Sequence, residues 1–279
     1  MRILGLGDNT VDSYVDLALQ FPGGNAVNVA VLAGRLGATA AYLGCIGGDE
    51  AGKVVSDALA AEGVETARLR RLEGPNARAF IAHQNGDRRF ISSSRGVRGQ
   101  YGWQDEDFAY VAGFDAVHTS IYSDLDDMLL RLARSARKLS YDHSERWTPE
   151  SLERTLPFLS TAFLSCPSLS DDDCRALLRR CAAAGPGTVV ATRGKAGAMA
   201  IAAGEILVQP AAPATVVDTL GAGDGFIAGF LVEQLRGAPV VAALAAGAAF
   251  AARVCSWQGA FGRGVPWTST EDAAATRAG

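Results

Sequence analysis

Short apolar runs alternate with longer stretches of helical spacing along most of this chain. The runs that read as buried strands cover residues 2–7, 40–46, 115–121, 139–142, 161–165 and 188–192. The helical stretches between them cover residues 23–36, 52–61, 125–137, 151–159 and 171–184. Strands that alternate with helices form a mostly parallel sheet with helices on both faces. The pattern therefore predicts an α/β fold of three layers, α/β/α, around a mostly parallel central sheet.

Two segments interrupt this alternation and read as antiparallel strands. Residues 14–21 alternate weakly and lead into Pro-Gly-Gly, and residues 78–92 form two strand-like runs around Asn-Gly-Asp. Such pieces do not fit a parallel core, so we expect a small separate antiparallel sheet with strands from about 13–22 and 76–93. A sheet beside a cleft is suited to act as a lid.

The rest of the chain shows no second domain. Residues 1–267 are expected to form one domain that includes the lid strands. Residues 268–279 are small and polar with no apolar anchor, and we expect them to fray.

The composition narrows the classes of protein and partner. Of the 279 residues 48% are hydrophobic, enough to bury a large core. The formal charge is −4 and the arginines are scattered without a basic run, which argues against a nucleic-acid partner. No signal peptide is visible, and the Ala-rich stretch 239–254 is short for a membrane span and contains Arg253. We therefore expect a cytoplasmic protein with no membrane partner; five cysteines without a CxxC pair argue against a disulfide framework.

The segment Asp218-Thr-Leu-Gly-Ala-Gly-Asp224 carries the strongest chemical indication. A helix can begin within Gly221-Ala222-Gly223, because apolar residues follow at helical spacing. The first backbone amides of a helix have no helical partner, and glycine lets an anion approach them closely. Asp224 would repel that anion, so we interpret it as a base that takes a proton from an attacking hydroxyl. The alternative is an Asp that only starts the helix.

Other motifs of nucleotide binding and catalysis are incomplete. Residues 47–53 match the first seven positions of a P-loop, but Val54 stands where Mg²⁺ coordination needs Ser or Thr. Gly5-x-Gly7 begins a dinucleotide motif whose third glycine is replaced by Thr10, so a dehydrogenase is only weakly supported. The three histidines are far apart in sequence and indicate neither a metal cluster nor a catalytic triad.

Two segments together resemble the paired motifs of the PfkB (ribokinase-like) carbohydrate kinases. They are Gly23-Gly-Asn-Ala-Val-Asn-Val-Ala30 and Asp218-Thr-Leu-Gly-Ala-Gly-Asp224. The stretches FPGGNAVNVAV, DTLGAGDGFIAGF and SWQGAFGRG are most similar to the fructoselysine kinases within that family. The resemblance implies a ribokinase-like fold. It also implies transfer of the γ-phosphoryl group of ATP to the 6-hydroxyl of a ketose-type sugar amine, with fructoselysine as the favoured substrate.

The resemblance assigns catalysis to the second motif. Asp224 becomes the base that deprotonates the sugar hydroxyl. Gly221, Ala222 and Gly223 become the anion hole for the transferred phosphoryl group, where positioning and charge stabilisation dominate.

The expected ions have less support from the residues. Mg²⁺ is expected with ATP. The place of the N-x-x-E motif that organises Mg²⁺ in the family is Ser165-Cys-Pro-Ser168, which lacks both residues, so no metal ligand is assigned. Asp171, Asp172 and Asp173 either supply the missing charge or cap the next helix. Asp218 matches a residue near a monovalent-cation site in relatives, so a requirement for K⁺ stays open.

The resemblance places the sugar against the first motif and the loop before it. We expect Asp12 to accept from two sugar hydroxyls and Gly23-Gly24 to pass close to the ring. Asn28 lies in an otherwise apolar helix, where its side-chain amide needs a hydrogen-bond partner that a sugar hydroxyl would supply. Asn9 and Asn25 are lesser candidates.

An amino-acid tail on the sugar needs partners for its carboxylate and its ammonium groups. Arginine suits a carboxylate because it binds in a bidentate fashion. The arginine candidates are Arg78, Arg88, Arg89 and Arg95, and the acidic candidates for the amine are Asp124 and Glu50.

A strand followed by Thr192-Arg-Gly-Lys-Ala-Gly197 resembles the nucleotide loop T-x-G-x-x-G of the family. Thr192, Gly194 and Gly197 match it, and Arg193 either steers phosphates or is simply solvated.

Three alternatives stay open from the sequence. A kinase of a plain sugar or nucleoside would keep the same fold and motifs. A non-catalytic sugar or nucleotide sensor would use the same scaffold, although Asp224 speaks against it. The predicted lid either remains a flap or pairs with a second copy in a homodimer.

Overall fold

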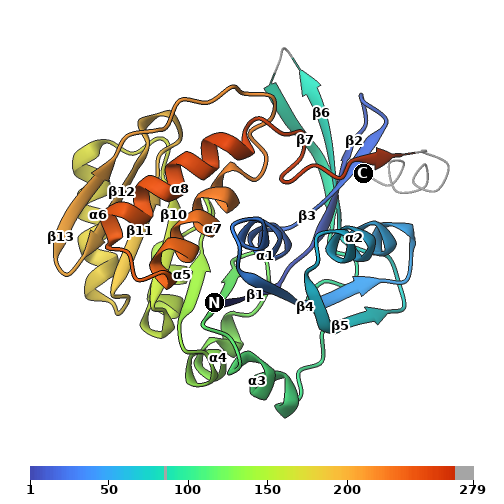
Figure 1. Ribbon diagram of the computed structural model, residues 1–279, viewed down its shortest axis with the longest axis horizontal. Helices are drawn as coiled ribbons and strands as arrows, with labels where there is room; N and C mark the ends of the chain where they lie inside the picture. The colour runs from blue at the N-terminus through green and yellow to red at the C-terminus, as the bar shows by residue number, and fades with distance from the viewer. Residues whose placement is uncertain (85–86, 268–279) are drawn as a thin grey trace.

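A nine-stranded sheet forms the centre of the protein (Figure 1). The computed structural model describes residues 1–84 and 87–267, apart from the side chains of residues 83–89. In spatial order the strands are β13 (Glu205–Gln209), β12 (Ala198–Ala202), β11 (Thr188–Thr192), β10 (Thr161–Ser165), β9 (Leu139–Asp142), β8 (Ala116–Ser120), β1 (Arg2–Gly7), β4 (Thr39–Gly47) and β5 (Glu65–Leu72). The strands from β11 to β5 pair in parallel, and β12 and β13 add an antiparallel edge.

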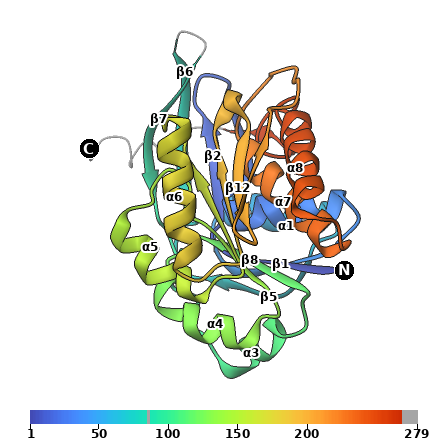
Figure 2. The same cartoon turned by 90° about the vertical axis from the view of Figure 1, so that its left-hand side faces the viewer.

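Helices cover both faces of this sheet, as Figure 2 shows. One face carries α1 (Asn25–Arg35), α2 (Glu50–Ala61), α7 (Ala222–Leu235) and α8 (Val240–Val254). The other face carries α3 (Asp105–Val111), α4 (Leu129–Ser135), α5 (Pro149–Thr155) and α6 (Asp171–Ala183). Successive strand residues point to opposite faces, so Ile3 packs in the first core and Leu4 in the second. The three-layer prediction is confirmed.

Close packing of α7 against α8 fixes where α7 begins. A Cβ atom at Gly229 would lie 2.9 Å from the carbonyl oxygen of Ala246, and one at Gly225 would lie 2.6 Å from Cγ2 of Val254. Glycines at these positions let the two helices approach to backbone contact. The first turn of α7, which carries Asp224, is therefore held on a rigid support.

A second sheet of five strands stands beside the first. Its order is β14 (Val265–Pro266), β3 (Leu19–Gly23), β2 (Thr10–Tyr14), β6 (Arg78–Gln84) and β7 (Asp87–Ser94). The hairpin predicted over 78–92 is confirmed as β6 and β7, and the weak segment 14–21 ends β2 and begins β3. The prediction of an antiparallel sheet needs one correction, because β2 and β6 pair in parallel. The chain returns to β6 only after α1, β4, α2 and β5, and a crossover of that length permits parallel pairing.

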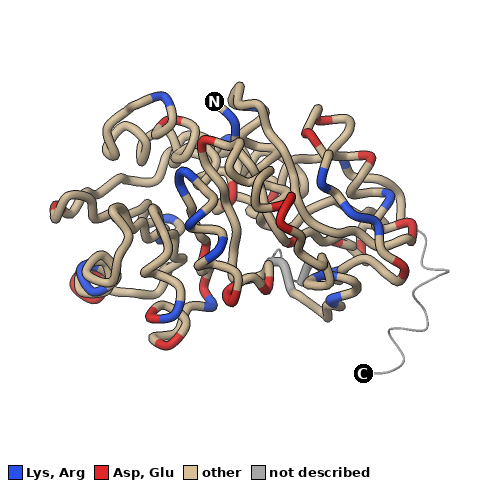
Figure 3. The backbone as a smooth tube through the Cα atoms, turned by 90° about the horizontal axis from the view of Figure 1, so that it is seen from below, with Lys and Arg blue, Asp and Glu red and all other residues tan. Residues whose placement is uncertain are grey.

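Charge is spread over the fold. Cationic and anionic residues are interspersed along the backbone in Figure 3. Among residues 1–84 and 87–267, no helix is both long and apolar enough to cross a membrane. All five cysteines are free thiols, and four are buried. The predicted fraying of residues 268–279 lies outside the described residues.

Candidate active site

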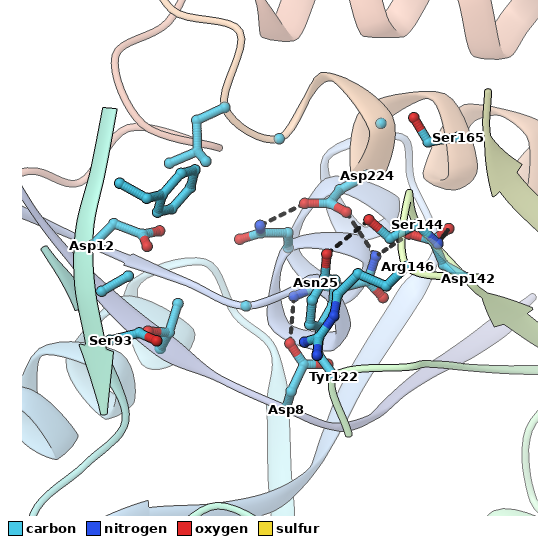
Figure 4. Close-up of a pocket in the computed structure, with 18 of the residues that line it drawn as sticks. Asp8, Asp12, Asn25, Ser93, Tyr122, Asp142, Ser144, Arg146, Ser165 and Asp224 are labelled. Atoms are coloured by element: carbon cyan, nitrogen blue, oxygen red, sulfur yellow. Dashed lines mark hydrogen bonds between the residues drawn. The ribbon is translucent and has the colours of Figure 1, made fainter. Parts of the chain in front are cut away.

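A cavity of about 440 Å³ lies where the carboxyl ends of the central strands meet the second sheet. Crevices at this edge of a parallel sheet are the usual ligand sites of α/β folds. Asp224, Asn25 and Asp142 gather on one side of the cavity, and Asp12 and Ser93 lie on the opposite side (Figure 4). Residues from several separate segments line it, among them Asp8, Asp12, Gly24, Asn25, Asn28, Arg78, Arg95, Arg98, Tyr122, Asp142, Arg146, Ser165, Thr192, Gly221, Gly223 and Asp224.

Asp224 lies in the first turn of α7 and faces this cavity. Its Oδ1 accepts a hydrogen bond from Asn25 Nδ2 at 2.8 Å, and its Oδ2 accepts one from Asn28 Nδ2 at 2.6 Å. Burial raises the pKa of Asp224 to about 6, while the Asn28 amide lowers it, the charge of Asp8 raises it further and the Asn25 amide lowers it. A carboxylate has about four lone-pair positions, so both oxygens retain capacity to accept a proton.

The backbone before Asp224 forms the turn that the sequence predicts. Gly221 caps α7 with a left-handed φ of 76°, and no side chain caps this end of the helix. The amides of Gly223 and Asp224 belong to the first turn, which has no intrahelical acceptor and forms the positive end of the helix. A Cβ atom at Gly223 would meet open space, so a ligand can approach there. The Ala222 amide instead lies 3.2 Å from the Thr219 carbonyl oxygen, and Ala222 does not line the cavity.

The residue before this turn ties it to the second sheet. Asp218 is buried, and its Oδ2 accepts from the Tyr14 hydroxyl at 2.7 Å and the Gly259 amide at 3.0 Å. Its Oδ1 accepts from the Leu220 amide at 2.9 Å. The carboxylate thus organises the 218–221 turn and links β2 to it.

Asp8 caps the helix that carries Asn25 and Asn28. Its Oδ2 accepts from the Asn25 amide at 2.7 Å, and its Oδ1 accepts from the Ser120 and Ser123 hydroxyls at 3.0 and 2.9 Å. Our sequence analysis missed Asp8 as a site residue. Its position directly after the first strand, at the carboxyl edge of a parallel sheet, was the available signal.

Asp142, at the end of β9, is a second carboxylate beside Asp224. Its Oδ2 accepts from Asn25 Nδ2 at 3.0 Å and its Oδ1 from the Ser144 amide at 2.8 Å. One amide group therefore bridges Asp142 and Asp224. Burial raises the pKa of Asp142 to about 7, the Ser144 amide opposes this, and the charges of Asp224 and Asp8 add to it.

Most of the predicted sugar-binding residues are brought together. Asp12 is 5% exposed and lines the cavity, and a Cβ atom at Gly23 would lie 2.5 Å from its Oδ2. Gly24 has a φ of 100° and passes so close to Asn9 that a Cβ atom would lie 2.4 Å from the Asn9 Cα. Asn28 donates to Asp224, and its Oδ1 is buried with no hydrogen-bond partner among the described residues.

Asn9, by contrast, is turned into the core. Its Nδ2 donates to the Tyr42 hydroxyl at 2.9 Å and to the Cys45 carbonyl oxygen at 2.6 Å. The residue does not line the cavity. These contacts hold Asn9 against β4. In the sequence, an Asn shortly after the first strand is compatible with either a ligand contact or a contact within the core, and the local pattern does not distinguish them.

The candidates for an amino-acid tail are divided. Arg78 lines the cavity, with Nη1 3.2 Å from Gln20 Oε1. Arg95 lines it too, but pairs with Asp124 at 2.6 Å, so that carboxylate already has a cationic partner. Glu50 lies on α2 beside a different hollow. The side chains of Arg88 and Arg89 lie outside the described residues.

The nucleotide loop follows β11 as expected, but its arginine faces elsewhere. Thr192 lines the cavity, and Gly197 has a φ of 86° where a Cβ atom would lie 2.1 Å from the Gln209 carbonyl oxygen. Arg193 is 8% exposed and pairs with Asp171 at 2.7 Å. It is therefore neither solvated nor directed into the cavity.

The acidic residues after Ser165 begin a helix. Ser170 is the N-cap of α6 and accepts from the Asp173 amide at 3.1 Å, while Asp171 pairs with Arg193. Within residues 1–84 and 87–267, no group of three or more His, Cys, Asp or Glu side chains is arranged to hold a metal. The three aspartates therefore occupy the first turn of α6 behind the Ser170 cap, at the positive end of the helix.

A three-layer α/β fold with a second sheet beside such a cavity is the arrangement of the ribokinase-like fold. The ribokinase of Arabidopsis thaliana, solved in complex with ribose and ATP, superimposes with a TM-score of 0.79 over 94% of this chain and 96% of that chain, at 20% identity. At this identity the likeness concerns the fold alone.

The family follows from the sequence comparisons. The model of the pfkB family carbohydrate kinases matches residues 9–266, and the chain belongs to that family. Fructosamine kinase FrlD of Bacillus subtilis (strain 168) is 38% identical over 271 residues, which cover 96% of this chain and 95% of that protein. Fructoselysine 6-kinase of Escherichia coli (strain K12) is 34% identical, covering 92% and 98%. The protein is a sugar kinase.

Proposed function

We propose that this protein transfers the γ-phosphoryl group of ATP to the 6-hydroxyl of a ketose-type sugar amine, with fructoselysine as the favoured substrate. The observation that carries the reaction is the place of Asp224: a carboxylate facing the cavity, beside the open amides that begin α7. The choice of a sugar amine is supported by the names of the relatives that share 34–38% of their residues with nearly the whole chain.

In the proposed reaction Asp224 takes the proton of the sugar hydroxyl. The freed oxygen forms a bond to the γ-phosphorus of ATP, the bond from that phosphorus to the β,γ-bridging oxygen breaks, and ADP leaves with the electron pair. The amides of Gly223 and Asp224 receive the charge that develops on the phosphoryl oxygens. A pKa of about 6 makes Asp224 a stronger base than an ordinary Asp while leaving it mostly ionised at pH 7.5.

The described side chains do not form a metal site of their own. Because the described residues offer no acidic cage, we assign Mg²⁺ to the phosphates of ATP, where it would neutralise charge, and derive no step through it. Hydrogen-bond donors, among them the Tyr14 hydroxyl and the Gly259 amide, likewise occupy the Asp218 carboxylate that pointed to K⁺, so no step is derived through a monovalent cation. Thr192, Gly194 and Gly197 are proposed to hold the nucleotide.

For the sugar we propose Asp12, Gly23, Gly24 and Asn28. The Asp12 carboxylate lines the cavity and suits hydroxyl donors, and Asn28 lines it with an Oδ1 that has no hydrogen-bond partner among the described residues. Arg78 is proposed as the partner of the substrate carboxylate, since its guanidinium has five donors in a fixed fork.

A test of the reaction uses Asp224→Asn, which keeps shape and loses basicity. We expect ATP and fructoselysine binding, measured by calorimetry, to stay within a few-fold of wild type. Transfer, measured as ADP release, is expected to fall by several orders of magnitude. Near-normal turnover in this variant would refute the assigned base, and absence of ATP-dependent product from the wild-type protein would instead favour a sensor.

A kinase of a plain sugar is the second candidate, favoured by one relative. Fructokinase of Klebsiella pneumoniae is 31% identical over 82% of this chain. Comparison of kcat/KM for fructoselysine, fructose, ribose and adenosine separates the two. Equal use of fructose and fructoselysine would remove the sugar-amine proposal and leave the kinase intact.

We also propose that residues 1–267 act as one domain in which the second sheet is the lid of the cavity. Its strand β7 exposes Phe90 (62%) and Ile91 (50%), apolar side chains that a bound substrate or a second copy of the chain would cover. Light scattering after gel filtration measures the oligomeric state; a monomer at all concentrations would argue for a flap.

A further inference from the structure

His118, in the middle of β8, is the buried start of a hydrogen-bond chain that ends on both site carboxylates. The side chain has no exposed surface. Its Nδ1 lies 2.9 Å from Ser140 Oγ, and its Nε2 lies 2.9 Å from Asn25 Oδ1. The amide nitrogen of Asn25 then donates to Asp142 and Asp224. Sequence analysis gave this histidine no role.

The donors and acceptors along this series of hydrogen bonds determine which ring nitrogen of His118 carries the proton. Both hydrogens of Asn25 Nδ2 go to carboxylates, so its Oδ1 is an acceptor and His118 Nε2 must be the donor. Nδ1 then accepts the single hydrogen of the Ser140 hydroxyl at 2.9 Å, in place of the longer contact of that hydroxyl to Val117 O at 3.2 Å. Burial lowers the pKa of His118 to about 3, so the ring is neutral at physiological pH.

The Nε2–H donor strengthens the preference of the Asn25 amide for the orientation that the two carboxylates already favour. With oxygen and nitrogen exchanged, the carbonyl oxygen would face two carboxylates and the NH₂ group would face His118. The Nε2–H group of His118 stabilises only the orientation of the Asn25 amide in which each carboxylate receives a hydrogen bond.

We propose that His118 is a positioning residue of the kinase: as a neutral Nε2–H donor it locks the Asn25 amide so that one hydrogen is delivered to Asp224 and the other to Asp142. The inference rests on the proposed role of Asp224 as the base. His118 does not line the cavity, so we expect it to touch neither the sugar nor ATP.

Loss of the His118 Nε2–H donor would change the pKa of Asp224. The hydrogen bond from Asn25 lowers the pKa of Asp224, so a mobile amide raises it. Other titratable or charged side chains that line the cavity around Asp224 stay in place in the variant; they are Asp8, Asp12, Arg78, Arg95, Arg98, Tyr122, Asp142 and Arg146.

The experiment compares His118→Leu, which removes the donor, with His118→Gln, whose amide nitrogen can replace Nε2–H. For His118→Leu we expect the acid limb of kcat/KM to move up by about one pH unit, the size of one hydrogen bond to a charged group. We expect the KM for ATP to change less than two-fold. His118→Gln should return the limb most of the way to wild type.

His143→Leu is the matched control, because His143 is also buried and bonded at both nitrogens, to Phe163 O and Thr155 Oγ1, but not to Asn25. It should lower the melting temperature without moving the limb. A folded His118→Leu variant with the wild-type limb, or a shift of equal size in His143→Leu, would overturn the inference.

A second measurement holds even where His118→Leu does not fold. Nitrogen-15 spectra of the wild-type protein, which has three histidines, report the tautomer of each ring. A neutral Nε2–H ring that does not titrate between pH 5 and 8 supports the proposal, and an Nδ1–H or titrating ring overturns it. Neither result depends on the base, whereas full activity of Asp224→Asn would remove the proposed function itself.

Discussion

A methyl group added at Gly23 tests whether Asp12 holds the sugar. The Cβ of Gly23→Ala would lie 2.5 Å from Asp12 Oδ2, a separation that real Cβ atoms do not show. The carboxylate must therefore retreat by about 0.5 Å or more to restore even a tight contact of 3.0 Å. Gly23 ends strand β3 and is not among the glycines of positive φ, so the backbone itself tolerates alanine.

The size of the effect follows from the interaction that is lost. A hydrogen bond to a charged group contributes about 1.5–3 kcal/mol, which corresponds to a factor of roughly 10 to 150 in affinity. Displacement of Asp12 should thus raise the KM for the sugar by that factor. The kcat and the KM for ATP should change by less than about three-fold, because Asp224 and the nucleotide loop are not touched.

Steady-state kinetics with each substrate varied in turn, together with a thermal melt, measures these quantities. Asp12→Asn should move the sugar KM in the same direction without steric displacement. A stable Gly23→Ala variant with an unchanged sugar KM would refute the assignment of Asp12. An equal rise in both KM values would show a general distortion of the site instead.

Three further predictions concern pH and the backbone. Since the pKa of Asp224 is raised to about 6 and the base must be ionised, kcat/KM should rise with pH through about 6 and level off above 7; a flat profile from pH 5 to 8 contradicts this. The pKa of Asp142 is raised to about 7 from 3.8, so the folded state binds the proton more tightly than the unfolded chain. The free energy of unfolding should then fall as pH rises from about 4 to 7, by up to about 4 kcal/mol, and Asp142→Asn should flatten that slope in urea titrations. Gly24→Ala and Gly63→Ala both force alanine to a positive φ, but only the first meets backbone, that of Asn9, so its loss of stability should be the larger by at least about 1 kcal/mol; equal losses in denaturant melts would argue against the steric account.

Much of the fold was predictable because its evidence is local. The spacing of apolar residues within a window of about ten positions indicates whether a strand is buried on both faces or a helix on one face. Strands β1, β4, β8, β9, β10 and β11 were found in this way. Strand β5, with its sequence ETARLRRL, was not, because an edge strand that is half exposed keeps charged residues and shows no continuous apolar run.

The candidate site was most predictable where a short motif contains it. The Gly-rich turn and Asp224 lie within seven residues, so sequence alone placed a carboxylate at the start of a helix. Arg193 lies in an equally short motif, yet its side chain turns to Asp171 and away from the cavity. A motif fixes the backbone, but the direction of a long side chain depends on which charge lies nearby.

The sequence by itself therefore determined the layers and the parallel sheet, and it placed a carboxylate at the start of a helix, since each of these depends on neighbours along the chain. Only the tertiary structure decided which acids and amides share the cavity. Asn25 reaches Asp142 across 117 positions and Asp224 across 199, and Asn9 is occupied by the carbonyl of Cys45. The physical reason is that hydrogen bonds between side chains require atoms to be within about 3 Å. Packing of whole elements sets those separations, and no local pattern records them.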